Sequence, residues 1–297
     1  MTRFGVAFPK IPGAGRTEIA TFARKVEGLG FDSMWVFDRL VYDNLASLSL
    51  LGALAVLTER IRMGTCVLLP LLHNPLVLAK ELATIDQASR GRLTLGLGIG
   101  SRAVDYQAAT LPGSARGRRM DETLALMRQA WSGQPVEHEG QVFSIHVPAV
   151  GPRPVQRRLP IWLSGRSKPA MARAARVADG FILGRGSPEW HKDWLADLRQ
   201  EAAAAGRDWE TLPTAALVFF GPNPEAITAH FQRYYAAEPW RLEPVRHGIY
   251  GAPRRAAEQL GQFLELGLDT IICVPTTLDL EDIDRLAEAV GVIARAP

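Results

Sequence analysis

Short apolar runs alternate with amphipathic stretches along the whole chain. The runs have the length of β-strands, and the stretches between them repeat apolar residues every three or four positions, as on one face of a helix. Eight runs predict strands, at 3–8, 31–37, 61–69, 91–100, 161–163, 180–183, 215–220 and 270–274. Helices are predicted over 17–29, 44–58, 75–89, 117–131, 169–178, 188–205, 224–235, 253–266 and 280–293.

The order of these elements predicts the fold class. Strands that are apolar throughout are typical of a parallel sheet buried on both faces. Eight of them alternating with helices predict an α/β fold, a (β/α)8 TIM barrel, in a single domain over residues 1–297. The alternation breaks after the fourth strand, where residues 132–160 form an insertion with a predicted hairpin around Glu139 and Gly140. Active sites of such barrels lie at the carboxyl ends of the strands.

The fourth strand ends in Gly98-Ile99-Gly100-Ser101-Arg102. Glycines at alternate positions predict a bare edge that backbone amides can use to approach a ligand. Gly98, Gly100 and Ala103 also match a dinucleotide fingerprint, which needs a long helix directly after its loop. Residues 103–114 are too short and too broken for that helix, and the strand is not the first of its series. A Rossmann fold is therefore not expected.

Two later strand ends combine glycine with a cation. Ser164-Gly165-Arg166 follows the fifth strand and opens a helix, where amide groups and the helix dipole favour an anion. Gly184 and Arg185 follow the sixth strand. Together they predict a phosphate site, and the alternative is a helix cap beside a solvated arginine.

Composition and charge argue against several functions. The net charge is +3, but the arginines are scattered in pairs, so nucleic-acid binding is not expected. Six dispersed histidines lack metal-ligand spacing, so no metal site is expected, and no lysine lies in a predicted strand, as a Schiff-base aldolase would require. With no signal peptide and no membrane-length apolar run, we expect a cytoplasmic protein. Cys66 and Cys273 lie in apolar runs, and no disulfide is expected.

A series of motifs resembles the bacterial luciferase-like, flavin-dependent oxidoreductases. They occur in the family's order at 29–38, 53–64, 78–93, 117–122, 154–156 and 172–180. The resemblance implies a TIM barrel with an insertion after the fourth strand and a cofactor at the strand carboxyl ends. That cofactor would be reduced FMN or the deazaflavin coenzyme F420, and the substrate would be a small molecule. The resemblance also implies a homodimer.

The resemblance also implies roles for individual residues. A non-proline cis peptide is expected at Cys66–Val67, against the coenzyme ring, although Cys66 alone reads as a small buried apolar residue. Gly100, Ser101 and Arg102 would lie beside the ribityl chain. The phosphate would lie near Ser164, Gly165, Arg166, Gly184 and Arg185. Asp38 and Arg39 would face the reacting centre.

One departure from the family bears on the reaction. F420-dependent alcohol and sugar dehydrogenases of this family usually carry Asp-His where this chain has Asp38-Arg39. Arginine cannot act as a base near neutral pH, so alcohol oxidation of that type is not expected. Arg39 would instead hold an anionic substrate or stabilise charge on the reduced ring, with Asp38 orienting it. A purely structural Asp–Arg pair is the alternative.

The leading hypothesis is F420-dependent hydride transfer to or from a small organic substrate. A reduced-FMN monooxygenase and a non-catalytic flavin-binding barrel are the alternatives. The substrate is expected to lie among the loops at 41–45, 104–116, 137–159 and 238–250. Tyr106, Trp240 and Tyr250 are the predicted walls of its pocket.

Overall fold

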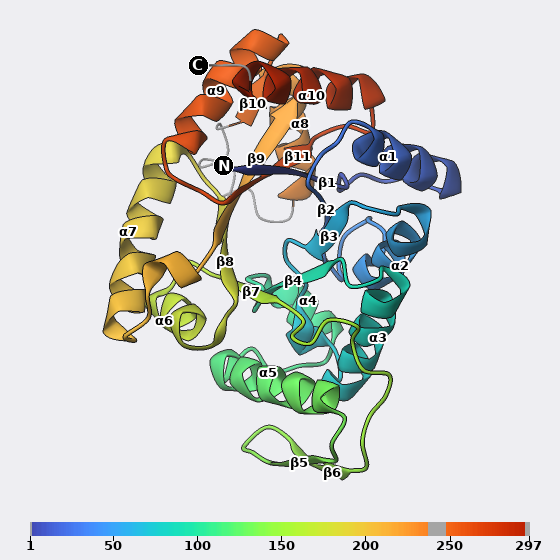
Figure 1. The fold of residues 1–297 in the computed structure, drawn as a ribbon, viewed down its shortest axis with the longest axis vertical. Coiled ribbons are helices and arrows are strands. Elements are labelled where there is room, and N and C mark those ends of the chain that lie inside the picture. The colour runs from blue at the N-terminus through green and yellow to red at the C-terminus, as the bar shows by residue number, and fades with distance from the viewer. Residues whose placement is uncertain (1, 237–247, 295–297) are drawn as a thin grey trace.

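The computed structural model describes residues 2–236 and 248–294. Within these residues, eight parallel strands close into a barrel surrounded by helices (Figure 1). In order around the ring they are β1 (Arg3–Ala7), β2 (Ser33–Val36), β3 (Arg62–Thr65), β4 (Leu93–Gly98), β7 (Ile161–Ser164), β8 (Gly180–Arg185), β9 (Thr214–Gly221) and β11 (Thr270–Pro275). Pairing of β8 with β9 and of β11 with β1 completes the ring, and β10 (Gly248–Tyr250) adds to β9. The predicted TIM barrel is confirmed.

The predicted helices are also found, with ends shifted by at most three residues. They are α1 (Arg16–Gly28), α2 (Ser47–Leu57), α3 (Pro75–Ala88), α5 (Arg116–Ser132), α6 (Lys168–Val177), α7 (Pro188–Ala204), α8 (Pro224–Tyr234), α9 (Pro253–Leu264) and α10 (Leu280–Ala294). Three shorter helices are η1 (Pro70–Leu72), α4 (Ala103–Ala108) and η2 (Trp209–Thr211). The Asn74 side chain caps α3 by accepting from the amides of Leu76 and Val77, which are otherwise unpaired in a first turn.

The insertion lies between β4 and β7 and contains the antiparallel hairpin of β5 (Val136–Glu139) and β6 (Ser144–Val147). Glu122 of α5 accepts hydrogen bonds from the amides of Val142 and Phe143, so the hairpin turn is tied to the outer helix (Figure 1). Gln156 then donates to Asp86 and to the Leu93 carbonyl, at the amino end of β4. The insertion therefore runs outside the barrel and returns along its amino end. The prediction that residues 137–159 help to enclose the substrate is wrong.

Two tryptophans fill the barrel interior toward the amino ends of the strands. The ring centroids of Trp35 and Trp162 are 6.3 Å apart, and both side chains are buried. A Cβ on Gly64 would lie 2.6 Å from the Trp35 ring, and one on Gly180 would lie 2.5 Å from the Trp162 ring. Glycine at these strand positions is therefore required by ring packing, because closer approach than about 3 Å forces a shift of the core.

The glycines of β4 likewise serve the packing of the protein on itself. A Cβ on Gly96 would lie 2.0 Å from the Thr65 carbonyl oxygen, and one on Gly98 would lie 2.6 Å from Val67 Cγ2. The space beside Gly96 and Gly98 is occupied by Thr65 and Val67, at and after the end of β3. The prediction that these two glycines leave room for a ligand is therefore corrected. Gly100 has φ of +81°, a left-handed conformation that favours glycine. The absence of a long helix after it is confirmed, since α4 ends at Ala108.

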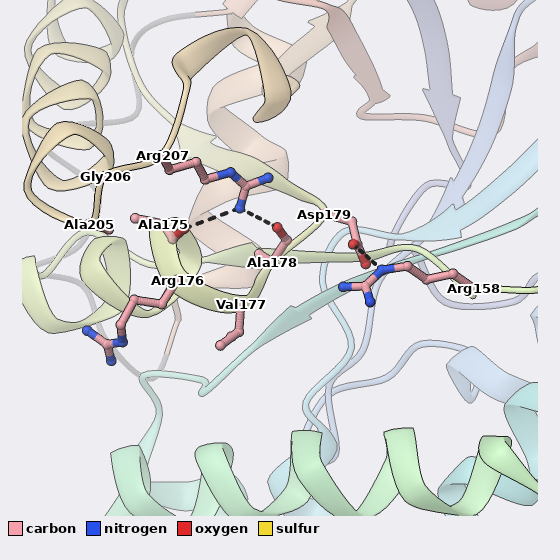
Figure 2. A pocket seen from close by; sticks show the side chains of 9 residues that line it. All are labelled: Arg158, Ala175, Arg176, Val177, Ala178, Asp179, Ala205, Gly206 and Arg207. Atoms are coloured by element: carbon pink, nitrogen blue, oxygen red, sulfur yellow. Dashed lines mark hydrogen bonds and ion pairs between the residues drawn. The ribbon is translucent and has the colours of Figure 1, made fainter.

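A surface hollow of about 510 Å³ lies at the amino end of the barrel, between α6, the start of β8 and the end of α7 (Figure 2). Two of its three arginines, Arg158 and Arg207, are already bound within the protein. Arg207 Nη1 donates to the Ala178 carbonyl at 2.6 Å, at the end of α6, and Arg158 Nε contacts Asp179 Oδ1 at 2.7 Å (Figure 2). We therefore assign this hollow a structural role, joining α6 and α7 to the barrel.

Candidate active site

The carboxyl ends of the eight strands meet at the opposite end of the ring, which we call the mouth. Ile182 of β8 packs inside the barrel with Trp162, and Gly184 lies two residues further on, where the pairing of β8 with β9 shifts register between Leu183 and Arg185. Within the described residues, no atom lies within 4 Å of the place where a Cβ on Gly184 would stand. Ser164 ends β7 and is paired with Ile182 of β8. Ser164 and Gly184 are both half-buried, and we call the partly exposed chain around these two strand ends the recess.

The two arginines predicted to bind phosphate point in different directions. The Arg185 guanidinium lies 4.5 Å from the ring centroid of Tyr235, above the mouth. Arg166 is exposed and lies 5.5 Å from the ring centroid of Trp194, on α7. The recess therefore has Arg185 beside it, whereas Arg166 lies toward the outer helices. His191 also supports the recess, because its Nε2 bonds to the Gly184 carbonyl at 2.7 Å.

A buried lysine stands just beyond β1. Lys10 is 5% exposed, and its Nζ lies 4.1 Å from the ring centroid of Phe37 and 3.8 Å from that of Tyr234. Among residues 2–236 and 248–294, this ammonium group has neither an ion pair nor a hydrogen bond. The pKa of Lys10 is lowered to about 8, chiefly by burial, with Tyr234 opposing the shift and the positive charge of Arg39 adding to it. Lys10 can therefore exchange a proton near neutral pH.

Arg39 is held by two partners that are distant in sequence. Its Nε donates to the Tyr234 hydroxyl, and its Nη1 contacts Asp105 Oδ2 at 3.4 Å. Asp105 is 1% exposed and also accepts from the Val41 amide at 3.0 Å. Burial opposes the charge on Arg39, but Tyr234 and Asp105 outweigh it and raise the pKa of the guanidinium. Arg39 is a fixed positive charge at the mouth.

Asp38 does not orient Arg39, and that expectation is wrong. Its Oδ2 accepts from the Leu69 amide at 2.9 Å, and its Oδ1 accepts from Ser47 Oγ at 3.1 Å. Asp38 thus anchors the chain after β3 to the start of α2. Its carboxylate contacts the Leu69 amide and the Ser47 hydroxyl. The carboxylate that contacts Arg39 is instead that of Asp105, on α4.

Replacing Asp38 by alanine is expected to lower the free energy of unfolding by about 2 kcal/mol, because the Leu69 amide loses its charged acceptor. Ser47→Ala is the matched control, since it removes only the longer of the two contacts and leaves the Leu69 amide bonded. Urea denaturation of both variants measures the difference. Equal losses in the two variants would contradict this assignment.

Two adjacent tyrosines at the end of α8 cover the mouth. Arg102 donates to the Tyr234 backbone carbonyl, and its guanidinium lies 4.7 Å from the Tyr234 ring centroid. Burial raises the pKa of Tyr234, but Lys10, Arg39 and Arg102 outweigh it, so the pKa lies below its usual value. Tyr234 and Tyr235 were not predicted as site residues, because two adjacent aromatic residues at the end of a helix are typical of ordinary helix packing.

The remaining predicted residues have varied surroundings. The non-proline cis peptide at Cys66–Val67 is present, and burial raises the pKa of the Cys66 thiol. Ser101 is exposed, whereas Arg102 is 4% exposed. Tyr106 is buried, and its hydroxyl donates to the Ile99 carbonyl. Trp240 lies outside the described residues, and Tyr250 is half-buried on β10.

Residues 2–274 match the model of a protein family described as luciferase-like monooxygenase. The chain belongs to this luciferase-like family. A relative from Nakamurella multipartita, named F420-dependent glucose-6-phosphate dehydrogenase, is 35% identical over 212 residues. That alignment covers 67% of this chain and 62% of the relative, which is less than two thirds of its length.

Solved structures share the fold of this luciferase-like protein. An F420-dependent secondary alcohol dehydrogenase in complex with an F420-acetone adduct gives a TM-score of 0.85 at 18% identity, covering 98% of this chain and 99% of the other. The oxygenating constituent of 3,6-diketocamphane monooxygenase from Pseudomonas putida, in complex with FMN, gives 0.80 at 18% identity, covering 99% and 97%. The same barrel thus occurs in F420-binding and FMN-binding proteins.

Three further expectations concern membrane spans, metal sites and disulfides, and the findings here apply to the described residues. None of their helices is long and apolar enough to cross a membrane. They contain no group of three or more His, Cys, Asp or Glu side chains that could hold a metal ion, and both described cysteines are free.

Proposed function

We propose that this protein is an F420-dependent oxidoreductase that reduces a small organic substrate. The 35% identical relative is named for that coenzyme, and this supports F420 over FMN. The observation at the site that carries the proposal is Lys10, a buried amine at the mouth with a pKa of about 8. When bound, the reduced deazaflavin supplies a hydride to a C=C, C=N or C=O bond, and such a reduction also needs a proton.

The recess fits the phosphate end of such a coenzyme. Gly184 leaves space where any side chain would intrude, Ser164 offers a hydroxyl, and Arg185 supplies positive charge. The cis peptide at Cys66–Val67 lies at the end of β3, on the inner rim of the mouth, where it would contact the flat ring. These residues suit a ligand with an aromatic ring and an anionic tail.

The residues around Lys10 suit proton donation. At pH 7 an amine with a pKa of about 8 is mostly protonated, so Lys10 can give a proton to the substrate atom that gains negative charge. Arg39 cannot exchange a proton there, but its fixed charge stabilises the same negative charge. The rings of Phe37, Phe219 and Tyr234 surround the amine and exclude water from it. Alcohol oxidation would need a base at Arg39, which this chain lacks.

A second candidate, a reduced-FMN monooxygenase, is supported by the likeness in fold to the FMN complex. Titration of the full chain with F420 and, separately, with FMN distinguishes the two through coenzyme fluorescence. We expect F420 to bind at least tenfold more tightly. Preferential binding of FMN would replace the proposed reaction with oxygen-dependent chemistry, and binding of neither would refute a flavin-type cofactor.

A variant at the recess tests where the coenzyme binds. Gly184→Val places a side chain in the open recess and is expected to weaken F420 binding at least tenfold, with the fold intact. Gly28→Val is the matched control, because Gly28 also has no atom within 4 Å but lies at the end of α1, outside the barrel. Equal F420 affinity in the two variants would place the phosphate elsewhere.

A further inference from the structure

A small cavity lies at the amino end of the barrel, on the other side of the tryptophan pair from the mouth. Its volume is about 90 Å³, and the buried rings of Trp35 and Trp162 form its apolar side. A water occupies about 30 Å³ in the liquid, so the cavity has room for a small organic molecule. We call this space the amino-end cavity. Its polar side comes from the first or second residues of five strands, which are Arg3, Ser33, Arg62, Thr94 and Thr270.

Strand alternation explains why these polar side chains meet. Thr270 lies two residues before Ile272, which packs inside the barrel in the same cluster as Trp35. Arg62 lies two residues before Gly64, where an added Cβ would lie 2.6 Å from the Trp35 ring. Residues two apart on a regular strand share a face. Thr270 and Arg62 therefore face the barrel interior on the amino-end side of the tryptophan rings.

Several polar groups in the amino-end cavity have no partner within the protein. Thr270 and Thr94 are 4% and 8% exposed, and neither hydroxyl has a hydrogen bond in residues 2–236 and 248–294. Ser33 Oγ accepts from Trp35 Nε1 at 2.8 Å, which leaves its own proton available to an acceptor. Because buried hydroxyls normally have hydrogen-bond partners, these three point to an acceptor inside the cavity.

The charged groups of the cavity favour an anion. Over the part of the chain that the structure describes, the guanidinium groups of Arg3 and Arg62 have no hydrogen bond and no ion pair. Asp32 is exposed at the rim, and its Oδ2 already accepts from the Phe4 amide at 2.7 Å. The lining therefore holds two positive charges and one negative charge. An oxyanion between the arginines would accept charge-assisted hydrogen bonds from both.

We propose that the amino-end cavity binds a short-chain carboxylate, with its oxygens between Arg3 and Arg62 and its hydrocarbon end against the indole rings. The hydroxyls of Thr94 and Thr270 donate to the same carboxylate. Such a ligand joins β1, β3, β4 and β11 at the end of the barrel opposite the mouth, and it stabilises the folded chain because it binds the folded state. The site is separate from the proposed function, whose residues follow the carboxyl ends of the strands.

Saturation-transfer NMR of the full chain with acetate, at constant ionic strength set with sodium chloride, measures this binding. We expect saturable binding, and formate should bind about fourfold more weakly because it lacks the methyl group that packs on the indole rings. Arg62→Gln should weaken acetate binding at least tenfold. Arg118→Gln is the matched control, an equal charge change on the exposed face of α5, and should alter the binding less than twofold.

Thr270→Val tests the site without a change in charge, in case Arg62→Gln does not fold. It keeps the size of the side chain and removes a hydroxyl that has no partner in the described residues, so the fold should be retained while acetate binding weakens about fivefold. Thr214→Val is its control and should leave the binding unchanged. Thr214 is also buried and is the first residue of β9, but it does not line the cavity.

Absence of saturable acetate binding would overturn the proposal. So would displacement of acetate by inorganic phosphate at a lower concentration than acetate itself requires, because the site would then select a tetrahedral oxyanion. Equal weakening by Arg62→Gln and Arg118→Gln, or by Thr270→Val and Thr214→Val, would place the acetate elsewhere. Binding of F420 to Arg62→Gln should match that of the unaltered chain, so failure of the proposed function is seen separately, as absence of coenzyme binding to both.

Discussion

Replacing Gly96 by alanine is expected to destabilise the barrel by about 3 kcal/mol. The added Cβ would stand 2.0 Å from the Thr65 carbonyl oxygen and 2.5 Å from Ile182 Cδ1. The isoleucine can adopt another rotamer, but the carbonyl belongs to the backbone of β3 and cannot. The Thr65 hydroxyl also donates to the Gly96 carbonyl at 2.7 Å, so moving β3 away would break a buried hydrogen bond as well.

Urea denaturation followed by circular dichroism measures this loss. Gly261→Ala is the matched control, because Gly261 lies inside α9 with no atom within 4 Å of the added Cβ. Alanine there should stabilise the protein by roughly 0.5–1 kcal/mol through helix propensity. A Gly96→Ala variant as stable as the unaltered chain would mean that β3 and β4 are spaced more widely than the structure has them.

Replacing Lys10 by methionine is expected to remove a rise of about 3 kcal/mol in the free energy of unfolding between pH 8 and pH 10.5. The pKa of Lys10 is about 8 in the folded chain and 10.5 in the reference state. Below pH 8 both states hold the proton, and the fold bears the cost of a buried charge. Between pH 8 and 10.5 the unfolded chain holds more protons than the folded chain, so stability from this group rises with pH. The methionine variant should lack that rise.

The groups facing Lys10 decide how this experiment is designed. Burial is the main cause of the lowered pKa, Arg39 and Arg185 add to it, and Tyr234 and Cys66 oppose it. Because Tyr234 also has a shifted pKa, the comparison is best made in a Tyr234→Phe background, by urea denaturation from pH 7 to 10.5. Lys80→Met, on the exposed face of α3, is the control for loss of a lysine. A stability difference between Lys10 and methionine that stays constant over this range would contradict the prediction.

Sequence patterns alone were sufficient for the fold of this protein. Strand and helix periodicity depends on which residues face the core, and that information is local. It predicted eight barrel strands, the helices between them and the hairpin near Glu139. The family motifs added the cis peptide at Cys66–Val67, which the structure contains. The same local signals placed Ser164 and Gly184 at strand ends, where the recess lies.

The composition of the site was decided only by the tertiary structure. Barrel closure brings Lys10 and Tyr234 together across more than two hundred residues, and no local pattern records which ring a cation will meet. Asp38 was expected to orient Arg39 because it is adjacent in sequence, yet Asp105 does so because α4 carries it over the mouth. The glycines of β4 were interpreted as leaving room for a ligand, but the space beside Gly96 is occupied by Thr65 of β3. Sequence thus determined which segments form strands and helices, whereas the choice of partners at the mouth follows from packing between distant segments.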